Sequence, residues 1–245
     1  MEGWDFSHLR ERAPITQQLP WSYPALVTDA AGGAVRMLDM GTGGGEFLLG
    51  LRTRAEFTVA NEAWPANVPV AAANLRGAGV PVVQDEGAPD NMDQARDPVH
   101  GRLPYRDAAF DLVVNRHESF VAAEVRRVLR PGGRFITQQV DFHWYDDLYA
   151  ALEMDPPGEE ATWLPSAASQ VEVAGMQVTQ ARQGEEHQSF RDVGAFLWYL
   201  RAVSWAVPDF DVNRCDAALR RLHEQMQSEP LVVREARFLL SAARP

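Results

Sequence analysis

The stretch Met37–Glu46, "MLDMGTGGGE", decides the fold, because it places a glycine-rich turn directly after a strand-like run. The run at 35–40 has β-strand character, and residues 47–51 resemble the start of a helix. Such a turn lies at the carboxyl edge of a sheet, where α/β proteins bind ligands. Glycine lets the backbone approach a ligand closely and adopt positive φ angles. The stretch therefore predicts a ligand-binding loop.

The spacing of the glycines bears on the class of ligand. The dinucleotide fingerprint is G-x-G-x-x-G. Counted from Gly41, the sixth position holds Glu46 instead of glycine. The pattern present is D-x-G-x-G-x-G, formed by Asp39, Gly41, Gly43 and Gly45. This pattern favours a ligand other than a dinucleotide, whereas an isolated glycine cluster could also be a plain tight turn.

Strand-like and helix-like segments alternate over the first 140 residues. The predicted strands are 35–40, 57–60, 80–83, 110–114 and 134–140, and the predicted helices are 47–51, 69–76 and 119–129. This alternation predicts a parallel sheet with helices on both faces and right-handed crossovers. Residues 85–109 are polar and contain prolines, so we expect a long loop there.

The remaining residues follow a different pattern. Helices are predicted at 193–205 and 213–227, and strands near 176–190 and 232–242. We expect a single domain over 1–245. It is divided into an N-terminal cap segment (1–30), a cofactor-binding core (31–141), and a part that completes the sheet and forms a substrate lid (142–245).

The amino-acid composition restricts the classes of partner and of chemistry that we expect. The formal net charge is −11, and all 23 basic residues are arginine, so Schiff-base and P-loop lysine chemistry are excluded. This acidic balance argues against a nucleic acid partner. Cys215 is the single cysteine, which excludes an internal disulfide and a multi-cysteine metal site. No apolar run reaches the ~18 residues of a membrane span, and no secretory signal is present, so we expect a cytoplasmic protein without a membrane partner or bound metal.

The glycine motif and its companions resemble the class I S-adenosylmethionine-dependent methyltransferases. The first motif is "LDMGTGGGE" at 38–46, and Glu62 closes the second strand. Two further segments, "LPYRDAAFDLVVNRHESF" at 103–120 and "EVRRVLRPGGRFI" at 124–136, follow in the family's order. The resemblance covers roughly residues 35–140.

The resemblance implies a Rossmann-like three-layer α/β/α fold. Its mostly parallel sheet has seven strands with the last one antiparallel, and lid helices lie at both ends of the chain. It also implies S-adenosylmethionine as cofactor and S-adenosylhomocysteine as product. The cofactor-binding residues that it implies are Asp39, Gly41, Thr42, Gly43, Gly45, Glu62, Asp85, Glu86 and Asn115.

Individual roles also follow from the resemblance. Glu62 would accept hydrogen bonds from the ribose hydroxyls, and Asp85 and Glu86 would lie near the adenine. Asp39 would support the glycine loop and approach the cofactor's amino group. For Glu62, Asp85 and Glu86, the alternative is a solvated surface carboxylate.

Methyl transfer from a sulfonium is an in-line displacement, so holding donor and acceptor in line can suffice without a catalytic residue. His117 follows the fourth predicted strand and is the candidate general base. The alternative is a histidine that only caps the sheet edge or the next helix. The candidate substrate-binding residues are Trp21, Tyr23, Arg116, His143 and Tyr145, several of which could instead serve packing.

We expect a methyltransferase that acts on a small-molecule acceptor. One alternative is a ribosomal or transfer RNA methyltransferase, which should carry a patch of clustered arginines. The other is a protein of this fold that binds the cofactor without transferring its methyl group. The sequence determines neither the acceptor atom nor the oligomeric state.

Overall fold

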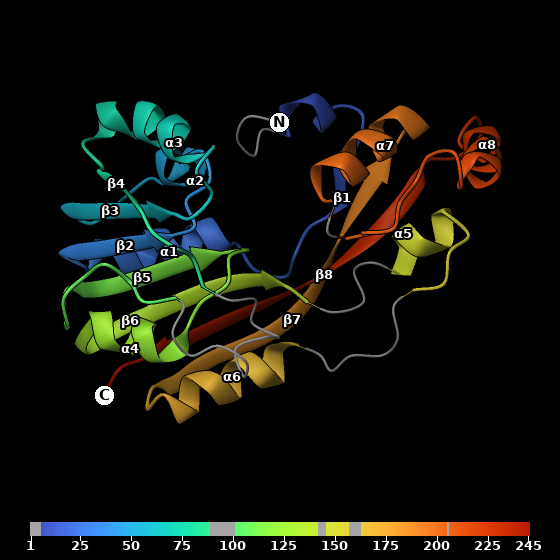
Figure 1. Cartoon of the computed structure of the whole chain (residues 1–245). Helices are drawn as coiled ribbons and strands as arrows, with labels where there is room; N and C mark the ends of the chain where they lie inside the picture. The colour runs from blue at the N-terminus through green and yellow to red at the C-terminus, as the bar shows by residue number, and fades with distance from the viewer. Residues whose placement is uncertain (1–5, 89–100, 142–145, 157–162, 205) are drawn as a thin grey trace.

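The computed structural model describes residues 6–88, 101–141, 146–156, 163–204 and 206–245. One eight-stranded sheet runs through the molecule in the order β1-β7-β8-β6-β5-β2-β3-β4 (Figure 1). Its strands are β1 (Ile15–Gln17), β2 (Arg36–Met40), β3 (Phe57–Glu62), β4 (Val82–Gln84), β5 (Phe110–Arg116), β6 (Leu129–Val140), β7 (Gln177–Phe190) and β8 (Leu231–Ala243).

The strands β2 to β6 are parallel to one another, and β8 is antiparallel to both of its neighbours, β6 and β7. The central strands read as nearly continuous apolar runs because helices bury both of their faces. Val113 and Val114 of β5, which point to opposite faces, are both fully buried. The predicted fold class is therefore confirmed. The short strand β1, antiparallel to β7, is an eighth strand that was not predicted.

Helices cover both faces of the parallel part and make three layers. One face packs against α1 (Tyr23–Gly32), α2 (Glu46–Gly50) and α3 (Val68–Leu75), and the other against α4 (Ala122–Val128) and α6 (Trp163–Val173). A short 3-10 turn, Arg76–Ala78, follows α3. The sequence analysis did not predict α1 or α6. It also placed the start of α4 three residues too early.

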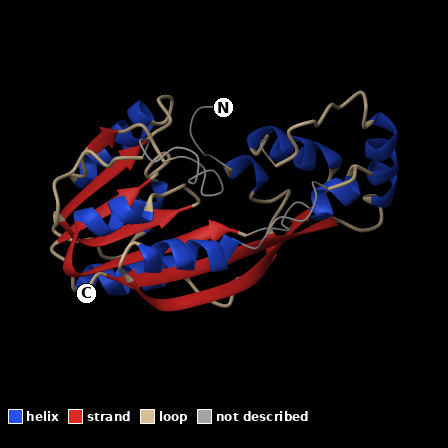
Figure 2. Ribbon diagram, turned by 60° about the horizontal axis from the view of Figure 1, so that its bottom comes forward, coloured by secondary structure: helices blue, strands red, loops and turns tan. Residues whose placement is uncertain are grey.

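A second group of helices packs against the far ends of the two longest strands. This group contains α5 (Asp146–Ala151), α7 (Val193–Ala202) and α8 (Asp216–Gln225), and a 3-10 turn at Ser7–Leu9 joins it. Figures 1 and 2 show β7 and β8 running out from the parallel part toward these helices. Phe190 and Phe196 are fully buried in this separate hydrophobic cluster. The predicted lid helices thus have a core of their own.

Candidate functional site

The glycine loop between β2 and α2 has the backbone that the motif predicts. Gly41, Gly43 and Gly45 have φ angles of +66°, +61° and +86°. These values lie in the left-handed region, which L side chains rarely adopt. In addition, a Cβ at Gly45 would lie 2.7 Å from Cγ of Leu75 on α3. Conformation and close packing therefore both require glycine here.

A buried carboxylate holds this loop in place. Glu62, the last residue of β3, accepts hydrogen bonds from the backbone N–H of Gly43 at 2.6 Å and of Trp64 at 2.8 Å. Burial raises the pKa of Glu62, and these two donors oppose that effect. The carboxylate therefore ties the glycine loop to the segment after β3. Each of its oxygens has a second acceptor position for another donor.

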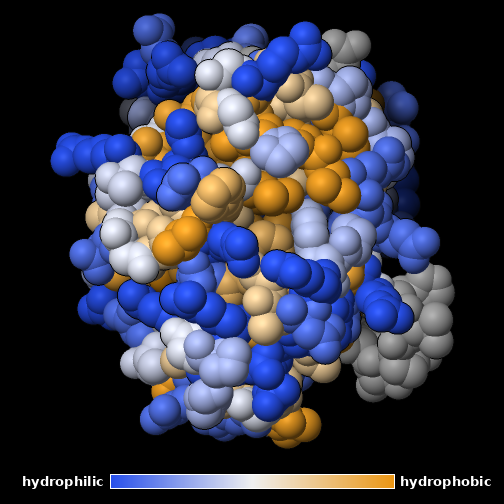
Figure 3. Space-filling view, turned by 90° about the vertical axis from the view of Figure 1, so that its left-hand side faces the viewer, coloured by the Kyte–Doolittle hydropathy of each residue, from blue (hydrophilic) through white to orange (hydrophobic). Residues whose placement is uncertain are grey.

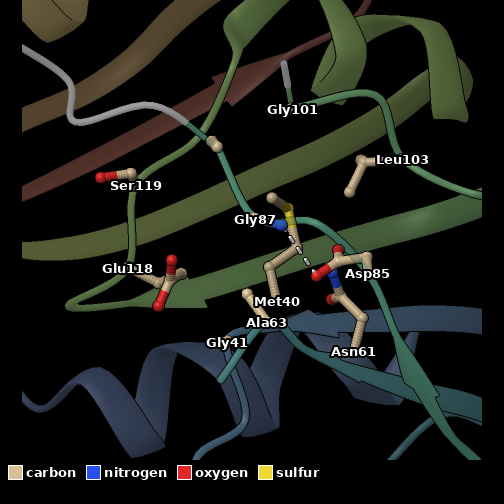
Figure 4. Close-up of a pocket in the computed structure, with 11 residues that line it drawn as sticks. Met40, Gly41, Asn61, Ala63, Asp85, Gly87, Gly101, Leu103, Glu118 and Ser119 are labelled. Atoms are coloured by element: carbon tan, nitrogen blue, oxygen red, sulfur yellow. Dashed lines mark hydrogen bonds between the residues drawn. The ribbon is translucent and has the colours of Figure 1, made fainter. Parts of the chain in front are cut away.

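A pocket opens beside the loop (Figure 4). Its walls come from the carboxyl ends of β2, β3, β4 and β5, as expected for this type of sheet. Asp85 lines the pocket, where its carboxylate accepts hydrogen bonds from the Asn61 side chain and, at 3.3 Å, from the backbone N–H of Gly87. Glu86 points elsewhere, because it is exposed and is not among the described pocket-lining residues.

Several buried polar atoms near the loop have no hydrogen-bond partner among the described residues. They are Oδ2 of Asp39, Oγ1 of Thr42 and Oδ1 of Asn61. Burial raises the pKa of Asp39 to about 7. Buried polar atoms in native proteins are nearly always hydrogen-bonded, so a group of unpaired ones marks a place where a polar ligand fits.

Two predicted site residues lie in the core. Asn115 is fully buried, and its Oδ1 accepts hydrogen bonds from Thr137 Oγ1 at 2.8 Å and Gln139 Nε2 at 2.5 Å. The hydroxyl of Tyr23 donates to the carbonyl of Asn115 at 2.9 Å and accepts from its N–H at 3.1 Å. Tyr23 is 2% exposed, so its hydroxyl braces α1 against β5 instead of facing an open surface.

His117 lies directly after β5 with a φ of +58°, so the chain turns sharply there. His117 as a residue is partly exposed at this turn, and its Nε2 lies 3.3 Å from Nε2 of Gln138. Burial of the imidazole, followed by the positive charges of Arg237 and Arg116, holds the pKa of His117 well below its ordinary value. The ring is therefore neutral at pH 7, the form that a general base requires. Arg116 is exposed, with its guanidinium 5.6 Å from the ring centroid of Phe47.

The turn at His117 brings Glu118 into the pocket. A Cβ on Gly41 would lie 3.0 Å from Oε2 of Glu118, so this side chain lies directly against the glycine loop. The sequence analysis assigned Glu118 no role in the site. In the structure α4 begins at Ala122, and Glu118 precedes it. Its position just after a strand at the carboxyl edge was the available signal.

Trp21 joins the same edge of the sheet from the N-terminal segment. Its indole N–H donates to Oε1 of Gln138 at 2.9 Å, so Gln138 contacts both Trp21 and His117. The ring also packs on Gly184 of β7, where a Cβ would lie 2.9 Å from it. The other two substrate candidates, His143 and Tyr145, fall outside the described residues.

A buried ionic cluster lies on the long strands near these residues. Arg237 of β8 pairs with Glu235 and, at 3.1 Å, with Glu186 of β7. The hydroxyl of Tyr199 on α7 donates to Oε1 of Glu235 at 2.5 Å. These contacts connect the second helix group to the strands that carry it. The positive charge of Arg237 also acts on His117.

A larger groove, of about 390 Å³, lies at the opposite end of the strands. Phe57 and Phe110, the first residues of β3 and β5, line it. Figure 3 looks onto this end of the molecule, where hydrophobic side chains gather among charged ones. Cofactors of open α/β sheets bind at the carboxyl ends of the strands, so this groove is not the expected cofactor site.

Within the described ranges, no helix combines the length and apolarity needed to cross a membrane. Within the same ranges, histidine, cysteine and carboxylate side chains form no group of three that could hold a metal ion.

Comparison with known proteins agrees with the fold and the glycine loop described above. A family model described as a methyltransferase domain matches residues 38–137. A protein of Bacillus halodurans C-125 with a proposed methyltransferase function has a similar structure, with a TM-score of 0.58 and 18% identity over 92% of this chain and all of the other. The YcgJ protein of Bacillus subtilis also has a similar structure, with a TM-score of 0.59. It is 16% identical over 90% of this chain and 97% of the other. No curated protein matches the chain in sequence.

A third similar structure is a geranyl diphosphate methyltransferase in complex with GPP and sinefungin. Its TM-score is 0.50, and it is 16% identical over 91% of this chain and 76% of the other. At these identities the structural likeness concerns the fold alone.

The glycine loop at the carboxyl edge of a mostly parallel sheet is typical of α/β proteins that bind a nucleoside-type cofactor. The family match over 38–137 begins within β2, ends within β6 and includes this loop. Residues 38–137 are thus similar to a methyltransferase domain, and the class that the fold and this match indicate is the class I S-adenosylmethionine-dependent methyltransferases.

The core role of Tyr23 can be tested by Tyr23→Phe. Removing the hydroxyl leaves the buried backbone groups of Asn115 without this partner, so we expect the free energy of unfolding to fall by about 1–3 kcal/mol. Urea denaturation measures the change. The matched control is Tyr105→Phe, because the buried hydroxyl of Tyr105 has no partner among the described residues and its loss should cost little. Equal effects of the two changes would contradict the bracing role.

Proposed function

We propose that this protein transfers the methyl group of S-adenosylmethionine to a small-molecule acceptor, with the pocket beside the glycine loop as the cofactor site. The observation that carries the proposal is the glycine loop itself. Three positive-φ glycines, locked by the Glu62 carboxylate, lie beside buried polar atoms that have no partner among the described residues.

The residues present fit this cofactor. The loop residues Gly41 to Gly45 offer close backbone approach. The unpaired oxygens of Asp39, Thr42 and Asn61 can bind its amino and hydroxyl groups. The open acceptor positions on Glu62 suit ribose hydroxyls, and Asp85 lines the pocket where the adenine is expected. When bound, the cofactor supplies an electrophilic methyl group on a positively charged sulfur.

His117 and Arg116 are the proposed acceptor-side residues. The His117 ring is neutral and lies beside Gln138, which also binds Trp21, so it can receive a proton from an acceptor held there. Arg116 presents an exposed guanidinium, which can bind a carboxylate or phosphate group of the acceptor. We propose that Trp21 provides the apolar wall of this region.

A small acceptor fits the charge of the chain better than a nucleic acid does. The net charge of −11 opposes association with phosphate backbones. The geranyl diphosphate methyltransferase shares the fold, and its bound GPP and sinefungin support a small acceptor and a cofactor of this type.

Glu62→Ala tests the cofactor site. The change removes a charged hydrogen-bond partner and releases the loop, so we expect S-adenosylmethionine affinity to fall by at least about tenfold in calorimetry. Glu86→Ala is the matched control, because Glu86 is an exposed carboxylate outside the described pocket lining. Unchanged affinity in the Glu62 variant would place the cofactor elsewhere.

The acceptor class is tested with a methyl-labelled donor and a panel of small molecules, transfer RNA and ribosomal RNA. We expect label on one or more small molecules and none on RNA. Label on RNA would overturn the small-acceptor proposal. Binding of the cofactor without transfer to any member would support a protein that does not methylate.

His117→Ala tests the general base once an acceptor is known. If His117 receives the proton, kcat should fall by about 10²- to 10⁴-fold. The wild-type pKa lies well below its ordinary value, so the base form persists through neutral pH. Wild-type kcat should therefore decline only at a pH well below the ordinary pKa of histidine. A kcat and pH profile that do not change in the variant would remove His117 from the chemistry.

A further inference from the structure

We propose that Glu118 is a specificity residue that makes the pocket favour the positively charged methyl donor over the uncharged thioether product. This inference rests on the proposed cofactor site. It concerns a residue that neither the glycine motif nor the resemblance to the family assigns to the cofactor.

The first observation is the position of Glu118. It lies two residues after β5, and the left-handed turn at His117 directs the chain toward the glycine loop. Its side chain packs so closely on Gly41 that any Cβ there would collide with it. Figure 4 shows Glu118 on one side of the pocket and Asp85 with Asn61 on the other.

The second observation is the charge of the lining. Glu118 and Asp85 both line the pocket, and none of the described lining residues is basic. Arg116, two positions before Glu118, lies over the Phe47 ring and is not part of the described lining. The pocket therefore concentrates negative charge in a partly enclosed space, where charges interact more strongly than in water.

The third observation is an unpaired acceptor aimed at the same space. Asn61 is 3% exposed and lines the pocket, and its Oδ1 has no hydrogen-bond partner among the described residues. The described polar side chains on the two sides of the pocket thus present mainly acceptor atoms. Such a lining matches a ligand that brings hydrogen-bond donors and positive charge.

The protonation of Glu118 agrees with this geometry. Burial, followed by the negative charges of Glu62 and Asp85, raises its pKa to about 7. Asp39, also near the loop, has a pKa of about 7 from burial. Glu118 is therefore disfavoured as an anion in the free protein, and a cation placed beside it would favour ionisation.

The donor and the product differ in the charge of one sulfur and in one methyl group. Both carry the same adenosine and the same amino acid group. Their difference in affinity therefore isolates the response to the sulfonium charge. A carboxylate near that charge stabilises the donor complex and adds little to the complex with the thioether.

The experiment measures the affinities for S-adenosylmethionine and S-adenosylhomocysteine by calorimetry in the wild-type protein, Glu118→Gln and Glu86→Gln. Glu118→Gln keeps the shape of the side chain and removes its charge. We expect donor affinity to fall by about tenfold and product affinity to change by less than about twofold. The control Glu86→Gln should leave both affinities unchanged.

A second measurement needs only the folded wild-type protein. As pH rises from 6 to 8, Glu118 loses its proton, so the ratio of donor to product affinity should increase. Both ligands carry the same amino group, so its titration changes both affinities alike and cancels in their ratio. The increase should be absent in Glu118→Gln, where Glu62, Asp85 and Asp39 remain, and present in Glu86→Gln.

The outcomes distinguish a failure of the charge selection by Glu118 from a failure of the proposed cofactor site. Equal weakening of donor and product by Glu118→Gln would mean that Glu118 contacts a shared group, and it would overturn the charge selection. A wild-type ratio that does not change with pH would overturn it as well. If the wild-type protein binds neither molecule, the proposed cofactor site itself fails.

Discussion

The site depends on one buried carboxylate that connects two strand ends. Glu62 ends β3 and accepts N–H groups from Gly43 and Trp64. Left-handed glycines lose much conformational freedom on ordering, so the loop needs such an anchor to hold one shape. These two hydrogen bonds tie the glycine loop to the segment after β3, on either side of which residues line the pocket.

The two longest strands, β7 and β8, connect the parallel part of the sheet to the second group of helices. β7 and β8 belong to the sheet that carries the proposed cofactor site, and they also carry a separate hydrophobic cluster with α5, α7 and α8 (Figure 2). The ion pairs of Arg237 with Glu186 and Glu235 lie on these strands, and the hydroxyl of Tyr199 reaches them from α7. β7 and β8 run through both the parallel part of the sheet and the second helix group. These strands therefore fix the position of that helix group with respect to the sheet edge where His117 and Trp21 lie.

Local patterns predicted the parallel core well, because strands buried on both faces must be apolar and the turns between them need glycine. Some signals were present but were not used. Ser22 is the N-cap of helix α1, its side chain accepts a hydrogen bond from the N–H of Ala25, and Pro24 lies in the first turn. These are ordinary helix-start signals. Other features had no local signal. The three-residue β1 exists only because β7, far along the chain, offers an edge for pairing.

The sequence by itself determined the strand–glycine loop–helix unit, the order of the motifs and hence the class of cofactor, because each depends on residues close together in the chain. The tertiary structure decided which side chains face the pocket. Tyr23, predicted to bind substrate, is drawn into the core by the backbone of Asn115. Glu118, to which the sequence analysis assigned no role, reaches the glycine loop because the chain turns at His117. The direction in which a side chain points depends on how the strands pair and where the chain turns. Residue type alone specifies neither of these.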